Sequence, residues 1–342
     1  MKIKEALAYD DVLLIPQYST IQSRQEISIA STLDGAHGRV RLSLPIIASP
    51  MDTISEVEMG IAMWQEGGLA VVHRYSAIEH QVDLLDQVIV GANANAAAAI
   101  GASGDYLERA TALYDAGARI LCIDVAHGHH VFMKEALHEL RAVFGDAVHI
   151  MAGNVATLEG YNDLVDWGAD SVRCNIGGGS ICSTRIQTGH GVPGLQTIMD
   201  CAASGRGAPI IADGGLRSAG DIVKALAAGA DFVMLGSLLA GTDETPGDII
   251  HAREGKFKSY RGMASKDAQL DWRGNMSSLE GIATTVRCRG PVADILDDLA
   301  RGIRSGLSYS GATTIAELQA KARFVKQTNS GQLESATHIL KR

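Results

Sequence analysis

The residues best placed for chemistry lie in one glycine-rich segment, residues 177–185, which reads Gly-Gly-Gly-Ser-Ile-Cys-Ser-Thr-Arg. A run of glycines lets backbone groups approach a ligand or an ion closely. Cys182, beside two hydroxyl side chains and near Arg185, is placed to act as a thiolate nucleophile. The alternative is a flexible glycine loop that carries a cysteine by chance, and this segment alone leaves both open.

Two further segments have the composition of a phosphate site. Asp213-Gly214-Gly215 and Gly236-Ser237 each follow an apolar run. Loops of this kind after the last two strands of an α/β barrel commonly bind phosphate through backbone N–H groups. Asp213 could accept hydrogen bonds from ribose hydroxyls. Because Ala-Asp-Gly-Gly is also an ordinary turn sequence, the phosphate interpretation depends on the fold.

A third polar segment, residues 124–130, reads Asp-Val-Ala-His-Gly-His-His. Its three histidines and one aspartate raise the question of a metal site. His127 and His129 straddle a turn glycine, however, and no cysteine or acid lies nearby at a matching spacing. We therefore favour a role in cofactor binding or in shaping the loop, with Asn154 as a partner on the same face.

These segments each follow a short apolar run that alternates with a stretch of helical periodicity. The eight runs are residues 45–49, 69–73, 97–101, 119–124, 148–153, 171–175, 209–213 and 232–236. Such alternation indicates βαβ units and a parallel sheet, and eight of them predict an α/β fold of the (β/α)8 TIM-barrel type. Barrel active sites lie at the carboxyl ends of the strands, where polar residues gather here. They are Asp52, His73, Asp124, Asn154, Asp213 and Ser237. A doubly wound open sheet is the alternative.

We expect a single catalytic domain over residues 1–342, with the barrel strands inside residues 46–240. Residues 1–45 should form an N-terminal cover with a short strand at 11–15. Residues 241–290, rich in glycine and low in periodicity, form a long flap-like excursion after strand eight, and such loops are usually functional lids or disordered. Residues 291–342 contain two helical stretches, 292–306 and 314–324, followed by a polar tail.

Composition narrows the class of protein. Hydrophobic residues make up 46% of the chain and charged residues 20%, enough for a large core, so a disordered chain is excluded. The net charge of −9 argues against nucleic-acid binding but allows a small anionic ligand. No long apolar run predicts a membrane span, and the five cysteines have no disulfide-framework spacing. Cys122, Cys174 and Cys201 suit a core, and we expect a cytoplasmic protein with reduced thiols.

Seven motifs stand in the order found in one known family, over nearly the whole chain. They are residues 9–16 (Tyr-Asp-Asp-Val-Leu-Leu-Ile-Pro), 50–53 (Pro-Met-Asp-Thr), 152–157 (Ala-Gly-Asn-Val-Ala-Thr), 180–184 (Ser-Ile-Cys-Ser-Thr), 212–215 (Ala-Asp-Gly-Gly), 234–237 (Met-Leu-Gly-Ser) and 260–263 (Tyr-Arg-Gly-Met). In these motifs the chain resembles the IMP dehydrogenase/GMP reductase family. Residues 173–175, Arg-Cys-Asn, depart from the Val-Gly usual in both branches, which leaves the loop geometry there open.

The resemblance implies that Cys182 attacks C2 of a purine nucleoside monophosphate, GMP or IMP, to give a covalent thioimidate. Thr184 and Glu280 would assist proton transfer. The resemblance also assigns a larger set of residues to the phosphate, the ribose and the base of the substrate. They are Ser180, Asp213, Gly214, Gly215, Gly236, Ser237, Tyr260, Gly262, Met263 and Gly281.

The glycine fingerprint of a Rossmann unit is absent, so a nicotinamide cofactor would have to bind across the barrel mouth. The resemblance implies cofactor contacts from Ser23, Arg24, Arg74, Asp124, Val125, Ala126 and Asn154. It also implies a potassium ion at the backbone carbonyls of Gly177, Gly179 and Cys182. Residues 332–335 resemble the segment that a neighbouring subunit adds to that ion site, which implies a homotetramer.

The remaining question is which reaction the chain performs. Dehydrogenases of the family oxidise IMP with NAD and hydrolyse the intermediate, whereas reductases release ammonia from GMP and take a hydride from NADPH. Four features favour the reductase: no regulatory domain near residues 80–101, no Arg-Tyr pair between Met263 and Glu280, the Ser23-Arg24 pair, and Arg185 followed by Thr188-Gly189. Residues 236–241, 260–263 and the tail look dehydrogenase-like, so an IMP dehydrogenase without the regulatory domain is the alternative.

Two other classes of protein could share this fold: a nucleotide-binding module and a flavin-dependent oxidoreductase. A nucleotide-binding module without activity would not need Cys182 and Thr184 together. A flavin-dependent barrel oxidoreductase would share the phosphate loops but not need the cysteine, and the purified protein would be yellow.

Overall fold

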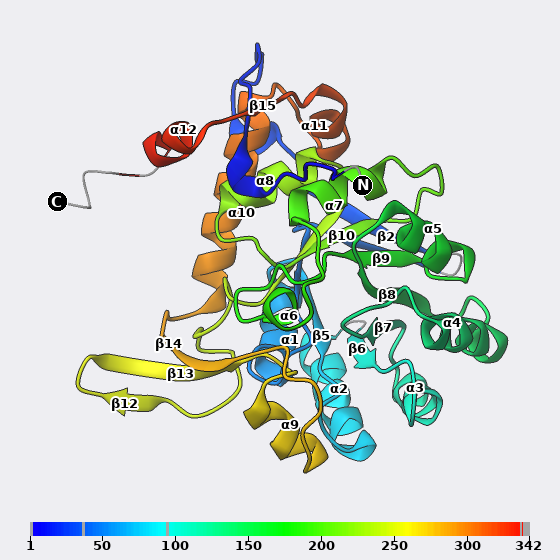
Figure 1. The fold of residues 1–342 in the computed structure, drawn as a ribbon. Helices are drawn as coiled ribbons and strands as arrows, with labels where there is room; N and C mark the ends of the chain where they lie inside the picture. The colour runs from blue at the N-terminus through cyan, green and yellow to red at the C-terminus, as the bar shows by residue number, and fades with distance from the viewer. Residues whose placement is uncertain (1–2, 36–37, 94–95, 336, 338–342) are drawn as a thin grey trace.

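The eight apolar runs form the eight parallel strands of a closed barrel in the computed structural model (Figure 1). The strands are β4 (Ile46–Ala48), β5 (Leu69–Val72), β6 (Ala97–Ile100), β7 (Ile120–Asp124), β8 (His149–Val155), β9 (Ser171–Cys174), β10 (Ile210–Asp213) and β11 (Phe232–Leu235). The ring closes because β11 pairs with β4, Val233 lying opposite Ile46. The predicted barrel is therefore confirmed and the open sheet is wrong. The structure describes residues 3–35, 38–93, 96–335 and 337, so the outermost residues of the predicted terminal segments lie outside the described residues.

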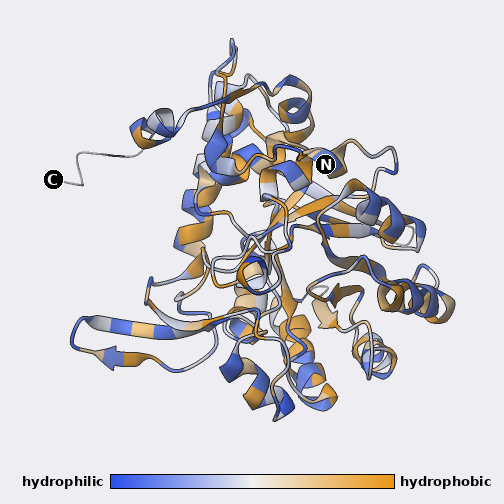
Figure 2. Cartoon of the chain, in the orientation of Figure 1, coloured by the Kyte–Doolittle hydropathy of each residue, from blue (hydrophilic) through white to orange (hydrophobic). Residues whose placement is uncertain are grey.

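Helices surround the barrel and bury one apolar face each against the strands (Figures 1 and 2). They are α1 (Val57–Gln65), α2 (Ile78–Ala92), α3 (Tyr106–Asp115), α4 (Val131–Phe144), α5 (Leu158–Asp166), α7 (Gly194–Ala202), α8 (Ala219–Ala227) and α10 (Val292–Tyr309). In α4 the buried residues Met133, Ala136, Leu137 and Leu140 recur at helical spacing. Because α2 leads within a few residues to β6, no inserted domain separates the two.

The N-terminal cover closes the amino end of the barrel. A hairpin of β2 (Ser31–Gly35) and β3 (Gly38–Leu42) was not predicted; it sends Leu33 and Leu42 into the same buried cluster as Leu69 and Phe232. Leu69 and Phe232 are the first residues of their strands. This end is thus filled with apolar side chains, which leaves the carboxyl ends of the strands for a ligand.

A strand near the amino end of the chain pairs with one near the carboxyl end in a second small sheet, and here two predicted boundaries are wrong. Asp11 belongs to the 3-10 helix η1 (Tyr9–Asp11), so the N-terminal strand is only β1 (Val12–Leu14). The helix expected over 314–324 is α11 (Ile315–Lys321), because the backbone is extended at Ala322 and β15 (Phe324–Lys326) then pairs with β1. The polar tail contains a further short helix, α12 (Asn329–Glu334), which projects from the body in Figure 1.

The excursion over residues 241–290 is ordered rather than a structureless loop. It contains β12 (Ile250–Ala252), β13 (Gly255–Arg261) and β14 (Ala283–Arg287), which form an antiparallel sheet, and the helix α9 (Lys266–Arg273). Figure 2 shows mostly hydrophilic residues on this projecting sheet, which is why apolar periodicity did not reveal it. Among the helices of the described residues, none has the length and apolar character needed to cross a membrane.

Candidate active site

A cavity of about 750 Å³ opens at the carboxyl ends of the barrel strands, between the barrel and the excursion. Its lining includes every residue that the resemblance assigned to catalysis, the substrate, the cofactor or potassium, except Ser23 and Arg24. The predicted residues that line it are Arg74, Asp124, Val125, Ala126, Asn154, Gly177, Gly179, Ser180, Cys182, Thr184, Asp213, Gly214, Gly215, Gly236, Ser237, Tyr260, Gly262, Met263, Glu280 and Gly281. Segments far apart in sequence therefore converge on one volume, the size of a typical small-molecule site.

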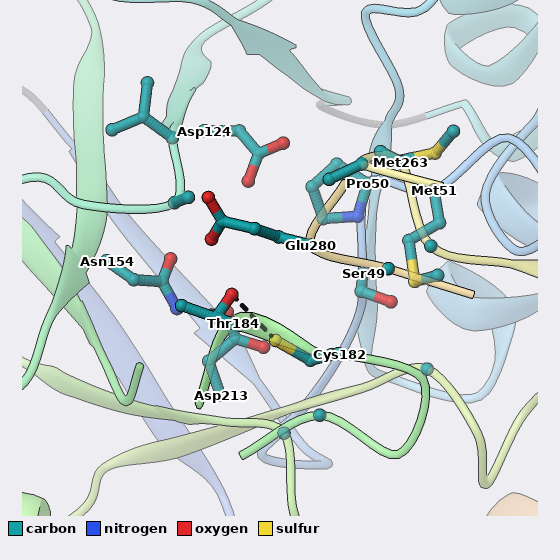
Figure 3. Close-up of a pocket in the computed structure, with 18 of the residues that line it drawn as sticks. Ser49, Pro50, Met51, Asp124, Asn154, Cys182, Thr184, Asp213, Met263 and Glu280 are labelled. Carbon is teal, nitrogen blue, oxygen red and sulfur yellow. Dashed lines mark hydrogen bonds between the residues drawn. The ribbon is translucent and has the colours of Figure 1, made fainter. Parts of the chain in front are cut away.

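Cys182 stands in this cavity on the loop after β9, directly before the short helix α6 (Thr184–Thr188). Its Sγ lies 3.1 Å from Oγ1 of Thr184, which is a hydrogen bond from the thiol to the hydroxyl (Figure 3). The loop turns back on itself because the N–H of Cys182 donates to the carbonyl of Gly179 at 3.2 Å. Gly177 has φ 78°, a conformation that glycine adopts without strain. The geometry pairs a thiol with a group able to relay its proton.

The excursion returns to the cysteine loop and pairs with it as a short β-bridge. The N–H of Ser183 donates to the carbonyl of Glu280 at 2.9 Å, and the N–H of Ile282 donates to the carbonyl of Ile181 at 3.0 Å. These bonds hold Glu280 beside the thiol. Figure 3 shows the Glu280 carboxylate pointing into the cavity, near Thr184 and Asp124. A carboxylate in this place can exchange protons with a bound ligand.

A second part of the cavity has the groups expected of a phosphate subsite. The hydroxyls of Ser180 and Tyr260 lie 3.4 Å apart, and burial raises the pKa of the Tyr260 phenol, which keeps it a hydrogen-bond donor. Gly214 and Gly215 have φ 80° and 77°, so their peptide groups turn in a way that other residues rarely allow. A side chain at Gly236 would meet the Tyr260 hydroxyl and Ser49 at 3.1 Å. Backbone and hydroxyl donors thus face one space.

Arg173, whose role no local sequence pattern predicts, lines the cavity as a buried cation between Asp124 and Asp213. Its guanidinium lies 2.7 Å from Oδ1 of Asp124 and 2.8 Å from Oδ2 of Asp213. Asn154 Nδ2 donates to the same Asp213 oxygen at 2.8 Å. One buried cation thereby links a residue predicted for the cofactor to a residue predicted for the ribose. Burial raises the pKa of the neighbouring Cys122 thiol to about 12, so that cysteine stays protonated.

An aromatic wall bounds the half of the cavity that contains Asp124, and it too was not predicted. Tyr75 Oη donates to Oδ2 of Asp124 at 3.0 Å. Trp272 of α9 meets the Tyr75 ring edge-on, with ring centroids 5.1 Å apart. The Arg74 guanidinium lies 5.0 Å from the centroid of the Tyr75 ring, a cation–π contact. This wall joins the excursion to the barrel on the side where a flat ligand could stack.

Two of the polar residues expected at the strand ends support the site without lining it. Asp52 accepts from Arg261 at 2.7 Å, and Arg261 also pairs with Asp271 of α9, so this cluster fixes the excursion to the barrel. His73 is buried and bonds to Glu56 at 2.9 Å.

Two histidines of the 124–130 segment bond to nearby residues of helices α4 and α5 rather than to groups of the cavity. His129 lies 2.9 Å from Asp163, and His130 accepts from the N–H of Phe132 as the N-cap of α4. Burial, with the neighbouring histidines, lowers the pKa of His127. Over the ranges that the structure describes, no three His, Cys, Asp or Glu side chains are arranged to hold a metal ion.

Ser23 and Arg24 lie away from the cavity of their own chain. Ser23 is the N-cap of the 3-10 helix η2 (Arg24–Glu26), where its hydroxyl accepts from the N–H of Gln25 and its own N–H donates to Glu26. Both Ser23 and Arg24 are exposed. In a single chain they contact no predicted cofactor residue, so their predicted role requires a neighbouring subunit.

The barrel, with a cysteine loop and two glycine turns at its mouth, defines the class as a TIM-barrel protein with a nucleotide-sized cavity. Residues 6–338 match the family described as the IMP dehydrogenase / GMP reductase domain. The chain belongs to this family of oxidoreductases of purine metabolism, as its motifs predicted.

Named relatives fall in both branches of the family. The chain is 32% identical to an inosine-5′-monophosphate dehydrogenase from Nitrosopumilus maritimus, with 99% of each chain covered. It is also 32% identical to a GMP reductase from Leishmania major, covering 98% of this chain and 97% of the relative. A GMP reductase from Trypanosoma brucei, solved in complex with guanosine 5′-monophosphate, superposes with a TM-score of 0.91 at 31% identity, over 98% of each chain.

Proposed function

We propose that the protein is a GMP reductase, which converts GMP to IMP and ammonia with NADPH. One observation carries the proposal. The segment between Met263 and Glu280 has no tyrosine, and its one arginine, Arg273, lies 4.1 Å from the Trp272 ring centroid and bonds to Ser277. The Arg-Tyr pair expected of a dehydrogenase is therefore missing, and hydrolysis would lack its general base.

The missing regulatory domain adds less support than the sequence alone suggested. The alignments to the Nitrosopumilus dehydrogenase and the Leishmania reductase run over 475 and 481 positions, well beyond the 342 residues of this chain. Both relatives therefore carry segments that this chain lacks. Chain length does not separate a reductase from a dehydrogenase, and the proposal rests on the excursion.

The arrangement suits two successive steps at C2 of the purine. Thr184 accepts the Cys182 proton while passing its own hydroxyl proton on towards the departing amine. The thiolate adds to C2 of GMP, the C2–N bond breaks, and the amine leaves as ammonia, which gives a thioimidate on Cys182. When bound, NADPH supplies the hydride that C2 accepts in the second step. The C2–S bond then breaks, the Cys182 thiolate is regenerated, and IMP is released.

Glu280 is proposed to protonate the departing amine, because its carboxylate is held in the cavity near Thr184. We expect Glu280→Gln to lower kcat for GMP reduction by ~10²-fold or more, with a smaller effect on KM. Glu254→Gln, at an exposed position in the turn between β12 and β13, is the control and should leave kcat unchanged. Full turnover by the Glu280→Gln protein would remove Glu280 from the mechanism.

The nicotinamide cofactor is assigned to the half of the cavity bounded by Arg74, Asp124, Val125, Ala126 and Asn154, with the aromatic wall beside it. Ser23 and Arg24 of a neighbouring subunit are proposed to reach its 2′-phosphate, which a guanidinium binds by paired hydrogen bonds. We expect Arg24→Ala to raise KM for NADPH ~10-fold or more and to leave KM for NADH nearly unchanged. Arg41→Ala, another exposed arginine of the N-terminal cover, is the control. Equal effects on both cofactors would contradict this assignment.

Potassium is proposed at the cysteine loop, where the carbonyls of Gly177, Gly179 and Cys182 would supply the oxygen ligands that a hard cation prefers. When bound, the ion would fix the loop that carries the thiol. Residues 332–335, at the carboxyl end of the projecting helix α12 and its C-cap, would reach a neighbour's loop rather than their own in a homotetramer. Sedimentation, and activity in potassium against lithium salts, test these two points.

The test of the proposed function is absorbance at 340 nm, with GMP and NADPH in one assay and IMP and NAD in another. Loss of NADPH signal together with released ammonia supports the reductase. Gain of NADH signal with IMP and no reaction of GMP would instead make the protein an IMP dehydrogenase, the candidate that residues 236–241 and 260–263 favour. In that case a group other than an Arg-Tyr pair would activate water.

A further inference from the structure

Asn175 lies between β9 and the glycine run, separated from Gly177 by Ile176, and it has an unusual conformation for a residue with a side chain. Its φ is 152°, in the region that favours glycine, and its side chain is buried, with only 4% of the residue exposed. Its backbone is held from both sides, since its N–H donates to the carbonyl of Val155 at 2.8 Å and its carbonyl accepts from Asn154 at 3.0 Å. Such strain persists only where surrounding contacts maintain it.

The side chain of Asn175 connects two loops of the cavity. Its Nδ2 donates to the carbonyl of Gly214, on the turn after β10, at 3.2 Å. The same side chain lies directly under Gly178, because a Cβ built on Gly178 would be only 2.1 Å from Nδ2 and 2.8 Å from Cγ of Asn175. The two loops also touch through Gly215, where an added Cβ would lie 3.1 Å from the carbonyl oxygen of Gly178.

The backbone conformation at position 178 does not require glycine. Unlike Gly177, it is not among the glycines with positive φ, so space alone restricts the residue there. That space is taken by Asn175. The Oδ1 atom of Asn175 is buried and has no hydrogen-bond partner among the described residues, so the hydrogen bond that this side chain makes there is the one from Nδ2 to Gly214.

We propose that Asn175 is a positioning residue that fixes the distance between the loop of residues 177–182 and the turn at residues 213–215. Position 178 is then glycine because Asn175 occupies the space that a side chain there would need. The proposal deepens the proposed function and rests on it, since Cys182 is the group that the loop carries. Through this contact, Asn175 fixes the distance between the thiol and the groups that hold the nucleotide.

The test is a double-mutant cycle with Asn175→Gly, Gly178→Ala and the combined variant. In Gly178→Ala the added methyl would clash with Asn175 and displace the loop of residues 177–182. This displacement should lower kcat/KM by ~10²-fold, as misplacement of a reacting group by about 1 Å does. Asn175→Gly relieves the backbone strain but loses the contact to Gly214, so a loss of about tenfold is expected. The combined variant should recover at least ~10-fold over Gly178→Ala, because the added methyl then has room. Gly205→Ala, at a glycine with ordinary φ and open surroundings, is the matched control.

A second readout needs no nucleotide: the rate at which iodoacetamide alkylates Cys182, mapped by mass spectrometry. Gly178→Ala should change this alkylation rate, and the combined variant should restore it. In the turnover assay, the loss of kcat/KM in Gly178→Ala should come from kcat more than from KM. Effects that simply add, or a Gly178→Ala protein that behaves like the unmodified one, overturn the positioning role. If the unmodified protein shows neither turnover nor alkylation at Cys182, the proposed function itself fails. That failure differs from failure of the positioning role, in which the unmodified protein is active and only the variants depart from expectation.

Discussion

Replacing Cys182 by alanine is expected to lower turnover by at least ~10⁴-fold, because no other group in the cavity can form the bond to C2. Among the described residues that line the cavity, Cys182 carries the one thiol, and its Sγ lies 3.1 Å from the Thr184 hydroxyl that would relay its proton. The loss should appear in kcat, since the substrate groups are assigned to other residues. Steady-state absorbance at 340 nm measures it, and ammonia release gives an independent rate.

Two comparisons make this expectation specific. Cys288→Ala removes the other partly exposed cysteine, which lies outside the cavity, and should leave kcat unchanged. The Cys182→Ala protein should still be stabilised against heat by GMP, because ligand that binds only the folded state raises its stability. Turnover within tenfold of the unmodified protein would mean that the reaction does not pass through a covalent intermediate on Cys182.

The barrel was predictable because its information is local and repeated. Each strand is a short apolar run bounded by polar or glycine residues, and each is followed by a helix with one apolar face. The residues at the carboxyl ends of such strands must meet at one face, so Cys182, Asp213 and Asn154 could be grouped without coordinates. The excursion could not be predicted in this way, because β12 and β14 are largely exposed and the residues of β13 that are buried include the polar Lys258 rather than an apolar series.

The roles of Arg173 and Asn175 depend on contacts that no local pattern records. Arg173 stands within an apolar strand, where spacing says only that its side chain faces one side. Its two carboxylate partners come from strands 49 and 40 residues away in sequence. The role of Asn175 becomes visible only because its side chain fills the space that a Cβ at Gly178 would need. The signal that could have pointed to Arg173 is its charge in the middle of a buried strand, since buried charges are rare unless paired.

Replacing Arg173 by methionine is expected to damage stability and catalysis together. The side chain is only 6% exposed, and without it Asp124 and Asp213 would share a buried space with no cation between them. Breaking such a pair typically costs about 3–5 kcal/mol of stability, because an uncompensated charge remains. Arg173→Lys should be intermediate in effect, since one ammonium cannot span both carboxylates as a planar guanidinium does. Arg206→Met, which removes the exposed pair with Asp166, should change the urea midpoint little.

The pH dependence of that loss distinguishes a missing charge from a missing side-chain volume. Burial alone would raise the pKa of Asp124, but Arg173, then Arg74, bring it below its ordinary value. A carboxyl with a depressed folded-state pKa stabilises the fold above about pH 4 and loses that contribution as pH falls further. Without Arg173 the burial effect should prevail and the sign reverses, so stability falls as pH rises above about 4. Urea unfolding at pH 5 and pH 8 should therefore show a larger deficit for Arg173→Met at pH 8. An equal deficit at both values would mean that Arg173 acts through packing alone.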